Sequence, residues 1–233
     1  MSQSPGAEQR EPTDELLEDA FHPRPLKNRR TAFEGRVWNV VSDTVSLDDE
    51  GHSMVRDYVD HTGAVAVIPV DDDGRIMVLK QYRHPVGMDL WEIPAGLLDV
   101  DGEGPQPAAA RELAEEADLE AADWHVLVDF FNSPGGSSEA LRVFVATGLS
   151  PVPEAERHVR TDEEAEFEYA WVTLQELVTA ILEGRIHNVS TVVGILALNA
   201  AVQRAGGELN GAALDAAGLR PADAPWPAHP RFR

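Results

Sequence analysis

The sequence contains no cysteine among its 233 residues. Disulfide bonds, thiolate metal sites and cysteine nucleophiles are therefore excluded, which fits a reducing compartment. Basic residues are also scarce, since 19 Lys and Arg stand against 41 Asp and Glu for a formal net charge of −22. Nucleic acids and anionic membranes bind clustered positive charge, so this composition argues against both as partners.

Long apolar runs are missing as well. No stretch approaches the roughly 20 apolar residues of a membrane-spanning helix. Residues 1–20 lack the basic start and apolar centre of a signal peptide. We therefore expect a cytoplasmic protein, and a chain of this length suits one well-cored domain with tails.

The pattern along the chain divides it into three parts. Residues 1–30 are polar and contain several prolines, which predicts a flexible N-terminal arm. We expect the folded domain at 31–205, and a C-terminal tail, or an arm ordered on a partner, at 206–233. Two strand patterns around a DDEGH turn signal predict an antiparallel hairpin within 31–60.

The elements of the domain are predicted from periodicity and caps. Further strands are expected at 63–70, 75–82, 123–131, 141–148 and 166–173. Helix patterns follow at 174–182, with a capping-box signal at Thr173 and Glu176, and at 189–204, with Asn188 as its cap.

The most informative stretch runs from residue 96 to 119, and its second half predicts a helix over 108–117. Glu112 and Glu116 lie four residues apart and project side by side, with Glu115 on the flank. Like charges at this spacing cost roughly 0.2–0.5 kcal/mol per pair. A hard divalent cation such as Mg²⁺ removes the conflict, and it commonly shares carboxylates with substrate phosphates. The alternative is a solvated acidic helix in which Arg111 simply pairs with Glu115.

The complete stretch resembles the Nudix box. The pattern is matched by Gly96, Glu103, Arg111, Glu112, Leu113, Glu115, Glu116 and Leu119. Six residues rather than five separate Gly96 from Glu103, and Asp118 stands where the pattern has Gly. We expect Asp118 to adopt the left-handed conformation that ends a helix, because Asp tolerates it better than most residues.

The resemblance extends to the ADP-ribose pyrophosphatase branch of the Nudix family, carried by the segments QYRHPVGMDLWEIPAG, SPGGSSE and EEAEFEYAW. It implies an α+β fold, the Nudix-type α/β/α sandwich with a mixed sheet, preceded by the N-terminal antiparallel hairpin. It also implies Mg²⁺-dependent hydrolysis of the diphosphate bond of ADP-ribose to AMP and ribose 5-phosphate. Alternatives are another nucleoside diphosphate sugar, such as GDP-mannose or a UDP-sugar, an oxidised nucleotide, or a module that senses ADP-ribose without cleaving it.

The same resemblance implies the roles of the metal-site residues. Glu112, Glu115, Glu116 and the main-chain carbonyl of Ala95 would hold Mg²⁺, with Mn²⁺ as a substitute, and Glu116 is central to catalysis. A loop late in the chain would supply the general base, for which Glu164 is the first candidate and Glu163 the second. Arg111 is expected to pair with a box glutamate, and the eight histidines show no metal-ligand spacing.

Four further residues are candidates for substrate binding. Arg83 would clamp phosphate, although a structural ion pair with Glu92 or Asp89 is the alternative. The other three are Trp38 for adenine, Arg56 for phosphate or ribose, and Glu139 for ribose hydroxyls. Trp38 also suits a core position on a strand. Members of this branch are homodimers in which the hairpin crosses to the other subunit, and Val37, Val40 and Val41 give this hairpin apolar surface.

Overall fold

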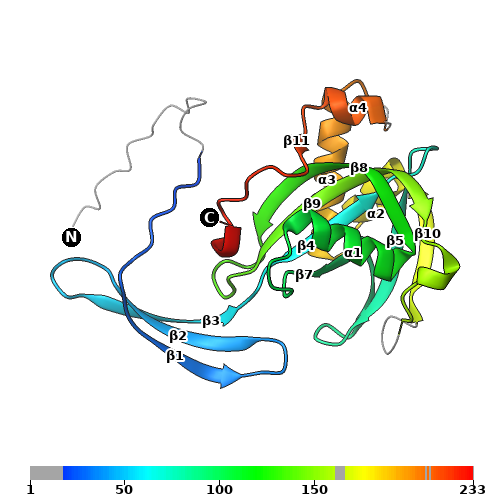
Figure 1. Cartoon of the computed structure of the whole chain (residues 1–233). Coiled ribbons are helices and arrows are strands. Elements are labelled where there is room, and N and C mark those ends of the chain that lie inside the picture. The colour runs from blue at the N-terminus through cyan, green and yellow to red at the C-terminus, as the bar shows by residue number, and fades with distance from the viewer. Residues whose placement is uncertain (1–17, 161–165, 208, 210, 233) are drawn as a thin grey trace.

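The computed structural model describes residues 18–160, 166–207, 209 and 211–232. The chain forms an α+β domain with a separate N-terminal sheet (Figure 1). None of the helices in this described part combines the length and apolar character needed to span a membrane.

The N-terminal sheet is antiparallel, has the order β1-β2-β3, and stands to one side of the core in Figure 1. Its strands are β1 (Leu26–Glu34), β2 (Asn39–Ser46) and β3 (Ser53–Asp60). The predicted hairpin is present as β2 and β3. However, β1 begins inside the segment 1–30 that was expected to be a flexible arm. All nine residues of β1 are exposed. Because no face of this strand is buried, its sequence does not need the alternation of apolar residues that predicts a strand.

A buried carboxylate ties β1 to the rest of this sheet. Arg29 on β1 donates from Nε and Nη2 to both oxygens of Asp43 on β2, at 2.8 and 2.7 Å. Tyr58 on β3 donates to the same carboxylate at 3.0 Å. The hydrogen bond from Arg29 lowers the pKa of Asp43 below its usual range. A polar cluster therefore joins the three strands where apolar contacts are few.

The core contains a mixed five-stranded sheet with the strand order β11-β8-β9-β4-β7. A smaller antiparallel sheet, with the order β10-β5-β6, lies beside it. In the larger sheet β4 pairs in parallel with β9, whereas the remaining pairings are antiparallel. The strands are β4 (Ala64–Pro69), β5 (Arg75–Arg83), β6 (Met88–Glu92), β7 (Ala95–Leu97), β8 (Leu119–Phe131), β9 (Ala140–Pro151), β10 (Glu168–Thr173) and β11 (Arg220–Pro221). The helices are α1 (Pro105–Ala117), α2 (Leu174–Leu182), α3 (Val189–Arg204) and α4 (Gly211–Ala216).

Helices cover both faces of the five-stranded sheet. Strand β4 is buried throughout, and its side chains alternate between two apolar clusters. Val65 and Val67 pack in the cluster that contains Leu113 of α1. On the other face, Ile68 packs in the cluster that contains Ile195 of α3. The expected α/β/α sandwich is therefore confirmed, with β4 packed between α1 and α3.

The local signals for helix ends are confirmed as well. Asp118 ends α1 at φ 53° and ψ 34°, and its N–H donates back to the carbonyl of Ala114. Thr173 and Glu176 form the capping box of α2, and the Asn188 side chain caps α3. Helix α1 begins earlier than the predicted 108–117, at Pro105, because proline is favoured in a first helical turn.

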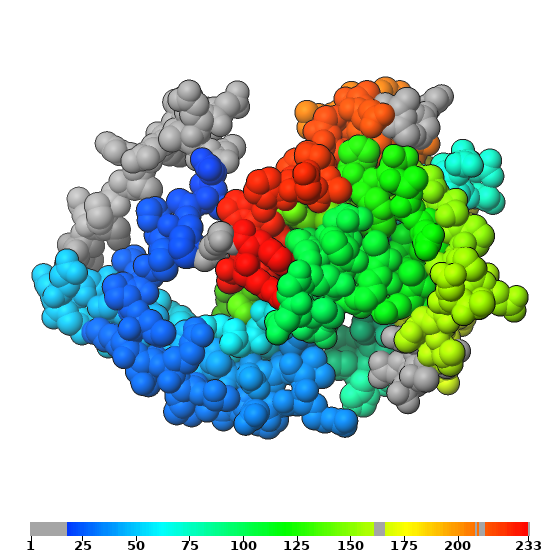
Figure 2. All heavy atoms as spheres, in the orientation of Figure 1, coloured from blue at the N-terminus to red at the C-terminus, as the bar shows by residue number. Residues whose placement is uncertain are grey.

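The C-terminal part of the chain packs on its own core. Trp226 is 2% exposed and His229 is 3% exposed, although 206–233 was expected to be a tail or an arm on a partner. Figure 1 shows this segment running from α4 and β11 along the side of the core that faces the N-terminal sheet, and Figure 2 shows its atoms lying against the core. Trp226 lies in the same apolar cluster as Leu113 and Phe144. The tail is thus a structural element of the domain.

Arg142 on β9 anchors this segment. Its side chain is 1% exposed, and it donates from Nε and Nη2 to both oxygens of Asp129 at 2.7 and 2.9 Å. The same guanidinium donates to the carbonyls of Ala224 and Pro225, and it lies 4.7 Å from the ring centroid of Trp226. A buried charge on the sheet is therefore satisfied partly by the C-terminal segment.

Replacing Arg142 by Met should lower the free energy of unfolding by about 3 kcal/mol, the lower end of the range for breaking a buried ion pair. The lower end applies because Arg220 still donates to Asp129 at 2.7 Å. Urea unfolding followed by circular dichroism measures the loss. Arg75→Met is the matched control, since Arg75 pairs with Asp71 at an exposed turn and should cost less than about 1 kcal/mol. Equal losses in the two variants would contradict the anchoring role of Arg142.

Candidate active site

The candidate site begins where β7 meets α1. The backbone N–H of Ala95 donates to Oε2 of Glu116 at 2.8 Å, and Glu116 is 8% exposed. The carbonyl of Glu116 accepts a hydrogen bond from the hydroxyl of Tyr169 on β10 at 2.8 Å. The carboxylate of Glu116 is therefore held on the strand that carries the Ala95 carbonyl.

Gly96 makes this close approach possible. A Cβ atom at residue 96 would lie only 1.9 Å from Cδ of Glu112. The Glu112 carboxylate thus occupies the space that any other residue at this position would fill. This contact explains physically why glycine is needed at the start of the motif.

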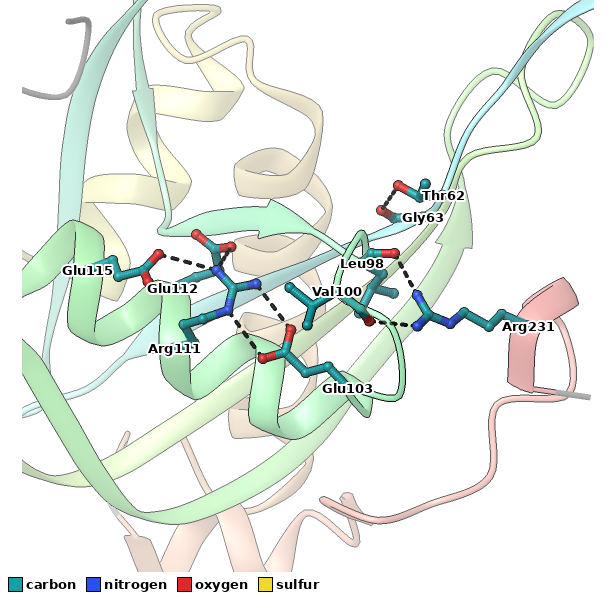
Figure 3. A network of polar contacts seen from close by, with 9 residues as sticks. All are labelled: Thr62, Gly63, Leu98, Val100, Glu103, Arg111, Glu112, Glu115 and Arg231. Atoms are coloured by element: carbon teal, nitrogen blue, oxygen red, sulfur yellow. Dashed lines mark hydrogen bonds and ion pairs between the residues drawn. The ribbon is translucent and has the colours of Figure 1, made fainter. Parts of the chain in front are cut away.

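Arg111 lies among three glutamates (Figure 3). It donates to both carboxylate oxygens of Glu103 at 3.2 and 3.1 Å, to Glu112 at 2.6 Å and to Glu115 at 3.2 Å. The predicted pairing of Arg111 with box glutamates is confirmed, and the pair with Glu103 joins the loop to the helix. Burial raises the pKa of Glu112 despite the opposing effect of Arg111.

The residues predicted as metal ligands fit a hard divalent cation by their chemistry. Glu112 and Glu116 offer carboxylate oxygens beside the carbonyl-bearing strand, and Glu115 is on the same helix. Magnesium takes oxygen donors of this kind. A cation would also favour the charged form of Glu112, which burial disfavours. Arg111 donates to Glu112 and Glu115, and the N–H of Ala95 donates to Glu116, so the protein orients these carboxylates itself.

A second group of acidic side chains, outside the box, has its ligand atoms close together. Among the described residues, the group of three or more acid or histidine side chains with ligand atoms all within 4.8 Å of one another is Asp48, Glu50 and His52. These three side chains are exposed on the turn between β2 and β3. No histidine was expected to bind metal from the sequence. Asp48 already pairs with His52, so the turn explains the grouping without an ion.

Arg83 makes the ion pair that the sequence offered as its alternative role. Its Nε and Nη2 donate to the two oxygens of Glu92 at 2.9 and 2.6 Å. Glu92 is 2% exposed, whereas the side chain of Arg83 is 40% exposed. The pair satisfies a buried carboxylate, and the Arg83 side chain remains partly exposed. Phosphate binding by Arg83 stays a prediction.

Trp38 and Glu139 both lie against His61, a residue that was not predicted from the sequence. The indole of Trp38 stacks on the His61 ring with centroids 4.0 Å apart and planes 18° from parallel. Nε2 of His61 lies 3.5 Å from Oε1 of Glu139, whose other oxygen accepts a hydrogen bond from Asn132. Burial lowers the pKa of His61, so the neutral ring is favoured. A single histidine after a strand carries no sequence signal for this role.

The remaining predicted residues are not joined to this group. Arg56 is exposed on β3, and its guanidinium donates to the carbonyl of Val55 at 2.9 Å. Glu163 and Glu164, the two candidates for the general base, lie outside the described residues. Their assignment therefore remains a prediction from the sequence.

Comparisons with known proteins agree with this arrangement. The family model described as NUDIX domain matches residues 60–191. An ADP-ribose pyrophosphatase of Mycobacterium tuberculosis is 42% identical over 181 residues, covering 78% of this chain and 86% of the relative. An ADP-ribose pyrophosphatase of Bacillus subtilis is 36% identical, covering 70% and 85%. A methanol dehydrogenase activator of Bacillus methanolicus is also 36% identical, covering 75% and 91%.

A solved structure supports the fold. The protein titled ADP compounds hydrolase superposes with a TM-score of 0.68 at 21% identity, covering 82% of this chain and all of that one. The family model over residues 60–191 and the relatives of 36–42% identity together identify the family of this chain. The chain belongs to the Nudix family, in the branch of the ADP-ribose pyrophosphatases.

Proposed function

We propose that this Nudix hydrolase cleaves the diphosphate bond of ADP-ribose to give AMP and ribose 5-phosphate. The observation that carries the proposal is the pair of box carboxylates that contact β7, Glu112 at Gly96 and Glu116 at Ala95, with Arg111 holding Glu103 and Glu115 beside them. Relatives named ADP-ribose pyrophosphatase, of 36–42% identity over most of the chain, support the choice of substrate. Because the glutamates are all present, a purely sensing module is disfavoured.

The metal would be Mg²⁺, with Mn²⁺ as a substitute, held by Glu112, Glu115, Glu116 and the carbonyl of Ala95. Bound there, it would neutralise the diphosphate and lower the pKa of an attacking water. The protein's own contribution is to hold these oxygens in place before substrate arrives. The hydrogen bond from Ala95 to Glu116 and the contact at Gly96 do this in the structure.

The substrate would lie between the box and the junction of β3 with β4. There the stacked Trp38 and His61 present an aromatic surface for adenine, and Glu139 offers an oxygen to ribose hydroxyls. Arg83, whose side chain is partly exposed, would contact a phosphate oxygen, because a guanidinium fork matches phosphate geometry. Arg56 is retained as a phosphate or ribose contact through the branch resemblance alone.

The proposed base is Glu164, with Glu163 as the second candidate, because both follow the loop pattern of this branch. A carboxylate there would accept the proton of the attacking water. The cytoplasmic location expected from the sequence stays a prediction.

We also propose a homodimer built through the N-terminal sheet. Its support is an unusually exposed sheet, since every residue of β1 is exposed. Phe33 is 63% exposed and Val37 is 65% exposed, whereas Val41 is buried within the chain. Exposed apolar side chains on a sheet that stands to one side of the core suit contact with a second copy.

Glu116→Gln should lower turnover of ADP-ribose in Mg²⁺ by more than about 100-fold. Mutating a residue that only hydrogen-bonds to a metal ligand already lowers metal affinity or activity by about 10–100-fold. Products are identified by chromatography across ADP-ribose, GDP-mannose, a UDP-sugar and an oxidised nucleotide. Glu183→Gln is the control, because Glu183 pairs with Arg185 at an exposed position. Wild type that leaves ADP-ribose intact while cleaving another compound would refute the substrate, and a fully active Glu116→Gln would refute the site.

The base assignment is tested by Glu164→Gln, which should reduce turnover by about 10²–10⁴-fold as expected for loss of a general base. Single-turnover kinetics with ADP-ribose and saturating Mg²⁺ measures the effect. Glu163→Gln is the neighbouring control and should retain most activity. The reverse ranking of the two variants would move the role to Glu163.

The dimer is tested by sedimentation equilibrium on the intact chain. A mass of twice the 25.4 kDa monomer is expected at micromolar concentration. Phe33→Glu places a charge on the exposed face of β1 and should shift the equilibrium toward monomer. A wild-type mass of one chain throughout this range contradicts the dimer.

A further inference from the structure

The end of the described chain reaches the loop that carries the box. Arg231 donates from Nη1 to the carbonyl of Leu98 at 2.9 Å and from Nη2 to the carbonyl of Val100 at 2.6 Å. Both carbonyls belong to the segment between β7 and α1. Figure 3 shows the guanidinium of Arg231 on the outer side of this loop, with Arg111 and its glutamates on the other. Asp101, fully exposed, lies 3.7 Å from the same guanidinium.

His229 holds the segment at a second point. Its Nδ1 accepts from the N–H of Arg231 at 3.1 Å, and its Nε2 lies 3.0 Å from the carbonyl of Thr62. Both contacts are satisfied when the ring is neutral with its proton on Nε2. Gly63, at φ +90°, lies so close that a Cβ there would be 2.1 Å from Nε2 of His229. The N–H of Leu98 in turn donates to the carbonyl of Gly63 at 3.0 Å.

The segment is rigidly supported where it leaves the sheet. Trp226 is buried over Arg142, and Phe232 stacks on Trp226 with centroids 6.0 Å apart and planes 12° from parallel. Arg231 therefore extends from a packed aromatic group, which reduces the conformational freedom it loses on binding the loop.

A continuous set of polar contacts leads from Arg231 to the box. The carbonyl of Val100 that accepts from Arg231 also accepts from the N–H of Glu103 at 3.3 Å. The Glu103 carboxylate binds Arg111, and Arg111 binds Glu112. The loop that Arg231 fixes thus holds the arginine that sets the positions of the box glutamates.

We propose that Arg231 is a positioning residue for the reaction. It fixes the loop after β7 so that Glu103 and Arg111 hold the glutamates of α1. It touches neither substrate nor reacting atoms. The kinetic part of this inference depends on the proposed function, whereas the structural part does not.

The test is Arg231→Met, which keeps the length of the side chain and removes its donors. Arg185→Met is the matched control, because Arg185 pairs with Glu183 at an exposed turn outside the site. Arg231→Lys is a conservative variant that retains the charge and can donate to one carbonyl. Arg231 is 30% exposed, so these variants should fold.

Hydrogen–deuterium exchange of the metal-free protein gives the readout that is independent of activity. We expect faster exchange at the amides of 98–103 in Arg231→Met, with thermal midpoint and exchange at α3 unchanged. With ADP-ribose and Mg²⁺, kcat should fall about 10-fold, the lower end of the effect of partners that orient a metal site, with KM nearly unchanged. Arg231→Lys should recover part of both effects, and Arg185→Met should show neither.

The outcomes separate the two proposals. Unchanged exchange at 98–103 in Arg231→Met overturns the positioning role, and so does faster exchange with an unchanged kcat. Equal effects in Arg185→Met would overturn it too, because the loss would then be general. If wild type does not hydrolyse ADP-ribose, the proposed function fails, and the same kinetic comparison is made on the compound from the panel that is cleaved.

Discussion

The contact between β7 and α1 is the constraint on which the site depends. The N–H of Ala95 binds the carboxylate of Glu116, and the missing side chain of Gly96 leaves room for Glu112. Two acidic groups are thereby held against a strand of the central sheet. The apolar face of the same helix packs in the core, where Leu113 is fully buried. This packing sets the distance between α1 and the sheet. Chemistry and packing are carried by opposite faces of one helix.

The connection between the N-terminal sheet and the core is equally constrained. His61 accepts from the N–H of Gly63 through Nδ1, and His229 contacts Thr62 from the other side. The same short connection thus meets Trp38, which stacks on His61, and the C-terminal segment. Trp38 and the C-terminal segment, which are far apart in sequence, therefore contact the same short connection.

Much of this architecture was predictable because its signals are local. The bounds of α3, the capping box of α2 and the left-handed Asp118 follow from short-range rules of caps and periodicity. The spacing of the box identified Arg111 as a partner of the glutamates, which the structure confirms.

The remainder was not predictable because its signals are distant. Strand β1 is exposed and charged, and it is held by Arg29 on Asp43 rather than by an apolar stripe. The C-terminal segment is rich in Ala, Asp and Pro, and it packs on the core through the contact between Trp226 and the distant Arg142. His61 contacts Glu139 only when the end of β3 lies beside the loop that carries Glu139. Each depends on a pairing of residues far apart in sequence.

Arg111 has a consequence for the electrostatics of the acidic cluster. Its guanidinium offsets part of the negative charge of Glu103, Glu112 and Glu115, to which it donates hydrogen bonds. Like charges three or four residues apart on a helix repel one another. Arg111 therefore lets the folded chain keep several carboxylates together on one loop and one short helix, and a neutral side chain at this position would leave their repulsion uncompensated.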